Sequence, residues 1–116
     1  MSGGKASQRK GAAGERELAK ELERYGYELK RGGMAFGEVP DLVGLPGIHV
    51  EVKRVEKLNL HEAMRQAVRD SEKFRDGAPV VFHRKNREPW LVTMRLDEWA
   101  EMYRGTGETG PVEEST

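Results

Sequence analysis

The strongest structural signal in the chain is a strict alternation of apolar and polar side chains over residues 48–53, which read Ile-His-Val-Glu-Val-Lys. Successive side chains of an extended backbone point to opposite faces, so this pattern predicts a strand with one apolar and one polar face. Glu51 and Lys53 are two residues apart and project from the same face, about 7 Å from each other along the backbone. The predicted strand therefore carries a carboxylate and an ammonium group side by side.

Apolar side chains three or four residues apart predict three helices. The first covers residues 11–25 and is ended by Gly26, because glycine readily adopts the backbone conformation that terminates a helix. The second covers residues 60–75, and Asn59 is placed to cap its N-terminus. The third is short and covers residues 96–103. Helical and extended segments therefore alternate along the chain.

Four further segments are predicted as strands, because they are short, contain apolar or β-branched residues and are bounded by Gly, Pro, Asn or Asp. They are residues 27–31, 42–45, 79–85 and 89–94, and the last two form a hairpin or a pair of neighbouring strands. The resulting order, α-β-β-β-α-β-β-α, predicts an α/β domain with a mixed β-sheet flanked by helices.

The length of 116 residues fits one domain with a modest core. Basic and acidic side chains balance at 20 each, but the two ends of the chain differ. Residues 1–10 hold only basic charges, and residues 105–116 hold only acidic ones. This distribution predicts a flexible basic arm (1–10), a folded domain (11–104) and a disordered acidic tail (105–116).

Several classes of protein are disfavoured by composition. The chain has no cysteine, so it has neither disulfides nor thiolate metal sites. Its apolar runs are far shorter than the roughly 20 residues that span a bilayer, and the first residues lack the apolar stretch of a secretory signal. A cytoplasmic location without a membrane partner is therefore expected.

Asp41 and Glu51 are candidate metal ligands. A tight turn at residues 46–47 joins the segment that follows Asp41 to the alternating strand, and antiparallel pairing across this turn would bring the two carboxylates together. Mg²⁺ prefers such hard oxygen ligands, and Lys53 beside them could act on a water or offset charge on a phosphate. The alternative is a solvated sheet edge, with Asp41 as a turn residue and a weak ion pair between Glu51 and Lys53.

Glu15 is a third carboxylate of interest. It lies three residues before Leu18 and seven before Leu22, on or beside the apolar stripe of the first helix. A carboxylate is costly there unless it has a partner, which favours a functional role. An acidic residue near a helix N-terminus is also explained by the helix dipole alone.

Three sequence segments together resemble a known family. Residues 10–18 read Lys-Gly-Ala-Ala-Gly-Glu-Arg-Glu-Leu, residues 40–42 read Pro-Asp-Leu, and residues 50–53 read Val-Glu-Val-Lys. These motifs resemble the archaeal and phage Holliday-junction resolvase family within the PD-(D/E)xK nucleases, over roughly residues 9–95. The resemblance implies a restriction-endonuclease-like fold and Mg²⁺-dependent cleavage of DNA, with Mn²⁺ as a substitute.

The resemblance also implies roles for individual residues. Asp41 and Glu51 would bind the metal, assisted by the backbone carbonyl of Val52. Lys53 would act on the attacking water, and Glu15 would complete the site through a bound water. Gln66 occupies the place on the following helix where several of these nucleases carry a glutamine near the site.

Basic side chains and one amide are predicted to contact DNA. Their charges can bind phosphates without reading the sequence, although a row of basic side chains on a helix is also typical of a solvated face. The predicted DNA contacts are Lys5, Arg9, Lys10, Arg16, Arg31, Arg54 and Gln66.

The three histidines are predicted to be too scattered in register to form a metal cluster. His49 shares the polar face with Glu51 and Lys53, so it is expected either to touch phosphate or water or to remain an exposed strand residue.

The sequence therefore predicts an endonuclease that acts on DNA as a homodimer, and the family resemblance implies branched DNA as its substrate. Apolar residues near the C-terminal end offer a dimer surface, although they could instead complete the core. Resolvases of this family usually carry a serine in the loop before the catalytic aspartate, and residues 32–39 contain none. A nickase or flap nuclease, or a DNA-binding protein with a vestigial site, are the alternatives.

Overall fold

The computed structural model describes residues 3–32 and 42–106, with side chains from residue 11 onward. The order of helices and strands agrees with the prediction. In chain order the elements are α1 (Gly3–Glu23), β1 (Lys30–Arg31), β2 (Leu42–Val43), β3 (Ile48–Arg54), α2 (Leu60–Phe74), β4 (Ala78–Arg84), β5 (Leu91–Met94) and α3 (Leu96–Arg104).

Three strands form a mixed sheet in the order β3-β4-β5. β3 and β4 run parallel, with Glu51 opposite Val81, and α2 makes the crossover between them. β4 and β5 run antiparallel, as expected of a hairpin or neighbouring strands. The predicted mixed sheet flanked by helices is confirmed.

The predicted pairing between the segment 42–45 and β3 is wrong for the described strands. β2 instead pairs antiparallel with β1, with Leu42 opposite Arg31. Gly44 has a φ of +137°, and a Cβ placed there would lie 2.6 Å from the carbonyl oxygen of Glu28. The chain at Gly44 is therefore packed against the segment that leads into β1, which directs β2 to that partner.

The first helix begins earlier than predicted. It starts at Gly3 instead of at residue 11, so residues 3–10, predicted as a flexible arm, lie within α1. This segment lacks proline and β-branched residues, and it is rich in good helix formers such as Ala6, Gln8 and Lys10. The basic residues Lys5, Arg9 and Lys10 therefore lie on the first helix and not in a separate arm.

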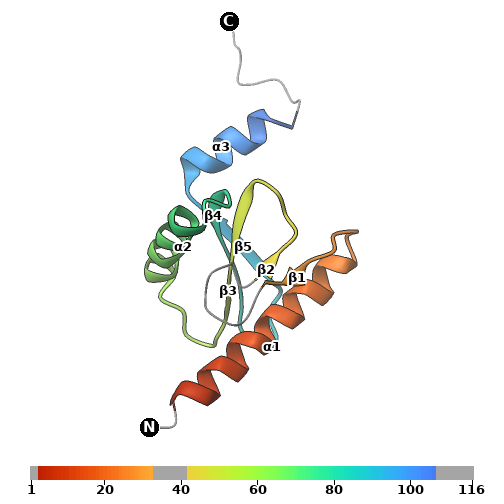
Figure 1. The fold of residues 1–116 in the computed structure, drawn as a ribbon, viewed down its shortest axis with the longest axis vertical. Helices are drawn as coiled ribbons and strands as arrows, with labels where there is room; N and C mark the ends of the chain where they lie inside the picture. The colour runs from red at the N-terminus through yellow and green to blue at the C-terminus, as the bar shows by residue number, and fades with distance from the viewer. Residues whose placement is uncertain (1–2, 33–41, 107–116) are drawn as a thin grey trace, which may run out of the picture.

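The two faces of the sheet are covered by different elements (Figure 1). On one face, Leu18 of α1 packs with Leu29, Leu42 and Val50 in the larger apolar cluster. On the other face, Val81 packs against Ala63 and Ala67 of α2 in a smaller cluster. The apolar side chains of β3 thus face α1, and its polar side chains face α2.

The third helix contributes little to either cluster. None of its residues is buried, and Leu96 is 77% exposed. Figure 1 shows α3 extending away from the sheet. In the described part of the chain, no helix is both long enough and apolar enough to cross a membrane.

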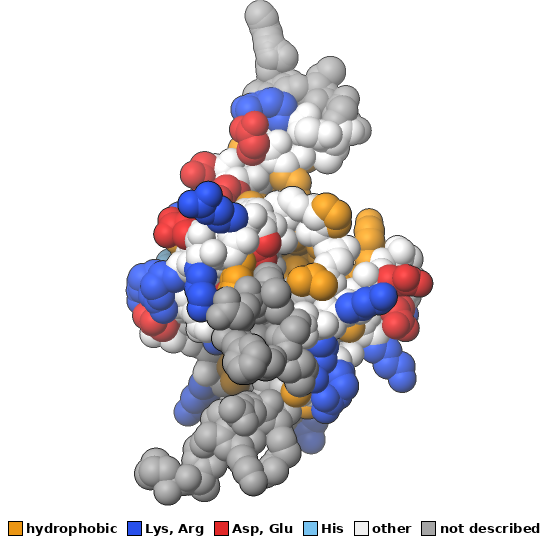
Figure 2. All heavy atoms as spheres, viewed as in Figure 1, with side chains coloured by type: hydrophobic (Ala, Val, Ile, Leu, Met, Phe, Trp, Pro, Cys, Tyr) orange, Lys and Arg blue, Asp and Glu red, His pale blue; other side chains and the backbone are white. Residues whose placement is uncertain are grey.

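Charged side chains are distributed over the surface. On the face shown in Figure 2, Lys and Arg side chains lie on both flanks and at the upper end of the molecule, with acidic side chains among them. The Lys and Arg side chains of the described residues do not gather in a single basic patch on that face. Charge alone therefore does not locate the DNA-binding surface there.

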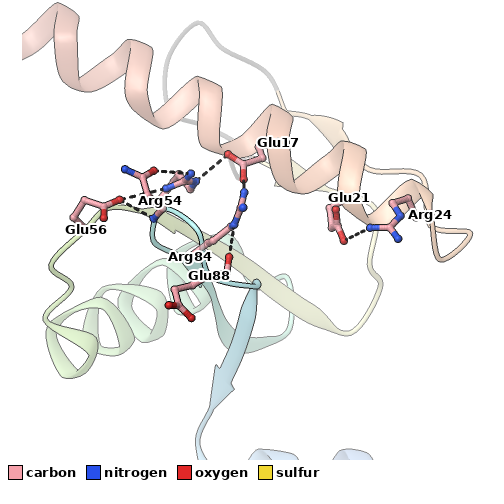
Figure 3. Close-up of polar contacts among 8 residues, drawn as sticks. Glu17, Glu21, Arg24, Arg54, Glu56, Arg84 and Glu88 are labelled. Atoms are coloured by element: carbon pink, nitrogen blue, oxygen red, sulfur yellow. Dashed lines mark hydrogen bonds and ion pairs between the residues drawn. The ribbon is translucent and has the colours of Figure 1, made fainter.

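A cluster of ion pairs connects α1 to the C-terminal ends of β3 and β4 (Figure 3). Glu17 accepts a hydrogen bond from Arg54 Nε at 2.9 Å and a second one from Arg84 Nη1. Close by, Gly14 lets the helix approach the strand, because a Cβ at Gly14 would lie only 2.9 Å from Arg54 Cβ. The contact thus depends on a small residue and on one carboxylate that serves two guanidinium groups.

Replacement of Glu17 by Ala is expected to lower the free energy of unfolding by about 1–2 kcal/mol, because two part-buried guanidinium groups each lose one of their acceptors. Urea denaturation measures this change. Glu21→Ala is the matched control one turn along the helix, where Glu21 pairs with an exposed Arg24, and its effect should stay within about 0.5 kcal/mol. Equal effects of the two substitutions would contradict the fastening role of Glu17.

Candidate active site

A row of polar side chains runs along the face of β3 that α2 covers. Lys53 Nζ donates a hydrogen bond to Gln66 Oε1 at 2.8 Å and lies 3.9 Å from Glu51 Oε2. The other oxygen of Glu51 accepts a hydrogen bond from His49 Nε2 at 2.9 Å, and His49 Nδ1 donates to Asp76 Oδ2 at 2.8 Å. A continuous polar row thus connects Gln66, Lys53, Glu51, His49 and Asp76.

The row forms because β3 and α2 run in opposite directions, and two residues of the strand cover nearly the same length as four residues of the helix. Two residues of a strand rise about 6.7 Å, and four residues of a helix rise about 6 Å. Alternate residues of β3 therefore meet every fourth residue of α2. Lys53 contacts Gln66, Glu51 lies near Asp70, and the ring of His49 stacks on Phe74 with centroids 6.3 Å apart.

His49 differs from its expected position. It is 2% exposed, so the prediction of an exposed strand histidine is wrong. Its ring is covered because the polar face of β3 lies beneath α2. Burial opposes the charged ring, but the hydrogen bonds and charges of Glu51 and Asp76 outweigh it and raise the pKa of His49 above its ordinary value.

The donor atoms around Glu51 fit a divalent cation. Single ligand atoms of His49, Glu51 and Asp70 all lie within 4.8 Å of one another. Of the three histidines, all among the described residues, His49 belongs to this group together with two carboxylates, whereas His61 and His83 lie outside it. The two carboxylates supply hard oxygen ligands that suit Mg²⁺ or Mn²⁺. Both ring nitrogens of His49 are hydrogen-bonded to carboxylates, so the imidazole would have to give up one of these contacts to bind a cation itself.

Glu15 is buried on α1, as the position of its carboxylate on the apolar stripe predicted. Its Oε1 accepts a hydrogen bond from Arg31 Nε at 3.1 Å. Glu15 does not belong to the group formed by His49, Glu51 and Asp70. Asp41 lies outside the described residues, although Leu42, the next residue, is buried and pairs with Arg31.

The remaining predicted residues occupy varied surroundings. The side chain of Val52 packs against the larger apolar cluster. Arg54 is bound in the ion-pair cluster with Glu17 and also donates to Asn86 Oδ1 at 3.0 Å, which gives it a structural role. Arg16 is exposed on α1, and the side chains of Lys5, Arg9 and Lys10 lie outside those described.

Two carboxylates near the site had not been singled out from the sequence. Asp70 follows Gln66 by four residues on α2, so helical spacing could have placed it on the same face. Asp76 comes just after the C-cap Arg75, and no sequence pattern marks its approach to β3. Asp76 reaches β3 because Arg75 adopts the left-handed conformation, with φ 52° and ψ 46°, and turns the chain back.

Known proteins resemble this chain in fold and in sequence. A solved structure from Archaeoglobus fulgidus, that of Hjc, a Holliday junction resolvase from an archaeal hyperthermophile, is 27% identical in sequence. It matches with a TM-score of 0.53 over 73% of this chain and 72% of that chain. No curated protein matches the chain.

The family described as "Phage putative PDDEXK endonuclease" matches residues 6–114, which is nearly the whole chain. This range includes all three motifs that suggested the resemblance. The chain therefore belongs to the phage PDDEXK endonuclease family and is a PD-(D/E)xK nuclease similar to the Holliday-junction resolvases.

Proposed function

We propose that this nuclease hydrolyses phosphodiester bonds of branched DNA with Mg²⁺, or Mn²⁺ in its place, at a site built on Glu51 and Lys53. The observation that carries this proposal is the adjacency of a buried carboxylate, Glu51, to an ammonium group held in place by Gln66. A solvated sheet edge, the simpler reading of the same residues, does not account for a Glu51 that is 8% exposed beneath a helix.

The metal ligands of this proposal are Glu51 and Asp41, with the backbone carbonyl of Val52, and with Glu15 acting through water. Each oxygen of Glu51 keeps a lone pair beyond the contact with its neighbour on β3, so it can still bind a cation. When bound, the cation supplies positive charge that stabilises the phosphate during displacement and favours ionisation of the attacking water.

Lys53 provides the second chemical function. The Lys53 side chain is 27% exposed, so a substrate phosphate can approach it from solvent. The hydrogen bond to Gln66 limits the motion of the long side chain, so the charge is positioned before DNA binds. In this role Lys53 orients or deprotonates the attacking water, or offsets negative charge as it develops on the phosphate.

Branched DNA is favoured as the substrate by the similarity to Hjc, which is a Holliday junction resolvase. Arg16 and Arg31 are proposed to contact the DNA backbone along α1 and β1, together with the basic residues at the start of α1. The absence of serine in residues 32–39 separates this chain from the usual resolvase pattern. Its choice of branch and its cleavage position are measured by cleavage of matched DNA substrates.

Cleavage is expected with Mg²⁺ and is expected to stop when EDTA removes the metal. The measurement uses end-labelled four-way junction, flap and linear duplex of matched length, with supercoiled plasmid as a nicking substrate. Preferential cutting of the junction supports a resolvase, and equal cutting of all shapes leaves a nuclease without branch preference. Binding without cleavage in either Mg²⁺ or Mn²⁺ would contradict the proposed activity.

A homodimer is proposed because resolving a junction needs two cuts, whereas one chain carries one copy of the Glu51–Lys53 pair. Exposed apolar side chains on β5 and α3 offer a surface for the second copy: Leu91, Val92, Leu96, Trp99, Met102 and Tyr103. Light scattering at micromolar concentration should give twice the chain mass of 13.1 kDa. A mass near that of one chain would rule out the dimer and leave cleavage by single copies.

A further inference from the structure

His49 connects two carboxylates that come from different parts of the chain. Both of its ring nitrogens are hydrogen-bonded, Nε2 to Glu51 at 2.9 Å and Nδ1 to Asp76 at 2.8 Å. An ionised carboxylate can only accept a hydrogen bond, so the imidazole is the donor in both contacts. The orientation of the Glu51 carboxylate is therefore linked, through the ring, to the segment that follows α2.

The ring itself is held from several sides. Its side chain is 3% exposed, and Phe74 stacks against it with an interplanar angle of 12°. The backbone N–H of Arg75 donates to the carbonyl of Ser71 at 2.7 Å, which ends α2 and sets the direction of the chain toward Asp76. A ring with this packing and two directed hydrogen bonds has little freedom to rotate.

One oxygen of the Asp76 carboxylate is buried in an unfavourable environment. This oxygen, Oδ1, is buried without a hydrogen-bond partner among the described residues. An unpaired buried oxygen is unfavourable and is uncommon in folded proteins. The contact that Asp76 does make, through Oδ2, is directed to His49.

We propose that His49 is a positioning residue that, anchored by Asp76, fixes the Glu51 carboxylate for divalent-cation binding. This inference rests on the proposed function, in which Glu51 is a metal ligand. The terminal torsion of a glutamate side chain is broad, so a free Glu51 would sample many orientations. Hydrogen bonds to a ligating carboxylate restrict that sampling, and loss of such outer contacts typically weakens metal binding by 10- to 100-fold.

Two substitutions of His49 distinguish a role in orienting the Glu51 carboxylate from a role in packing alone. The amide nitrogen of glutamine can reach the place of Nε2 and donate to Glu51, whereas that of asparagine falls near Nδ1 and faces Asp76. Both are uncharged polar amides, so a structural role would make them fail together. The positioning role predicts that only His49→Gln keeps the contact on which Glu51 depends.

The test measures binding of Mn²⁺ alone to the full chain, without DNA, by electron paramagnetic resonance. We expect His49→Asn to raise the dissociation constant by about 10- to 100-fold and His49→Gln to stay within about threefold of the native chain. Circular dichroism verifies that both variants are folded, and His83→Asn, on β4, is a control that should bind Mn²⁺ normally. Native-like binding by His49→Asn, or equal weakening in both His49 variants, would overturn the inference.

Two further variants keep the test decisive. Asp76→Ala removes the carboxylate that anchors His49, at a position between α2 and β4. It should weaken Mn²⁺ binding by up to roughly tenfold. Unchanged binding would again overturn the inference. Glu51→Gln distinguishes this inference from the proposed function. If Glu51→Gln binds Mn²⁺ like the native chain, the metal assignment itself fails, whereas loss there with normal binding in the His49 variants refutes only the positioning role.

Discussion

Glu51→Gln is expected to lower the rate of DNA cleavage by about 10³-fold or more, equivalent to roughly 4 kcal/mol of transition-state stabilisation. The substitution keeps the size of a side chain that is buried beneath α2, so the fold should survive. It removes the negative charge that the cation needs and that repels the substrate phosphate. DNA affinity should therefore stay the same or increase, as measured by gel shift in EDTA.

The control for Glu51 is Glu72→Gln, which removes an exposed carboxylate on α2 and should leave the rate unchanged. Asp41→Asn should reproduce the phenotype of Glu51→Gln, because both carboxylates are proposed to hold the same cation. Native cleavage rates in either variant would mean that the site lies elsewhere.

Lys53→Ala is expected to slow cleavage by roughly 10²–10⁴-fold, the range for one positioned acid–base or electrostatic group. The affinity for metal should change little, since the ammonium group is not a ligand. Single-turnover rates on the preferred substrate, measured at saturating metal, isolate the chemical step. A fall of less than threefold would return Lys53 to the role of a surface ion pair.

Lys57→Ala provides the matched comparison, because Lys57 is an exposed lysine shortly after β3. It should cleave at the native rate. Gln66→Ala should fall between the two lysine variants, since it frees the ammonium group without removing it.

Local patterns in the sequence were sufficient to predict individual elements. The alternation in residues 48–53 gave β3 and the shared face of Glu51 and Lys53. Asn59 was recognised as the N-cap of α2, and its side chain accepts from the backbone N–H of Glu62 at 3.0 Å. Such features depend on neighbours within a few residues, which a single sequence displays directly.

Features that depend on distant segments were harder to predict. The short strand after Asp41 had two available partners, and the packing of Gly44 against Glu28, which selects β1, is not visible as a pattern. The alternation of β3 also defines a polar face without indicating whether water or a helix covers it. For that reason His49 was expected at the surface, although α2 buries it.

The matched steps of β3 and α2 imply that helix length is more restricted than helix composition in this nuclease. A substitution at one of the facing positions alters one contact and leaves the others in place. Insertion of one residue between Gln66 and Asp70 would instead turn everything beyond it by about 100°. Asp70 would then move away from Glu51, and Phe74 would move away from His49 at the same time. The hydrogen bond between Lys53 and Gln66 would remain. The sequence of such a nuclease can therefore change by substitution at single positions of α2. An insertion or deletion within α2 would instead break several contacts of the site at once.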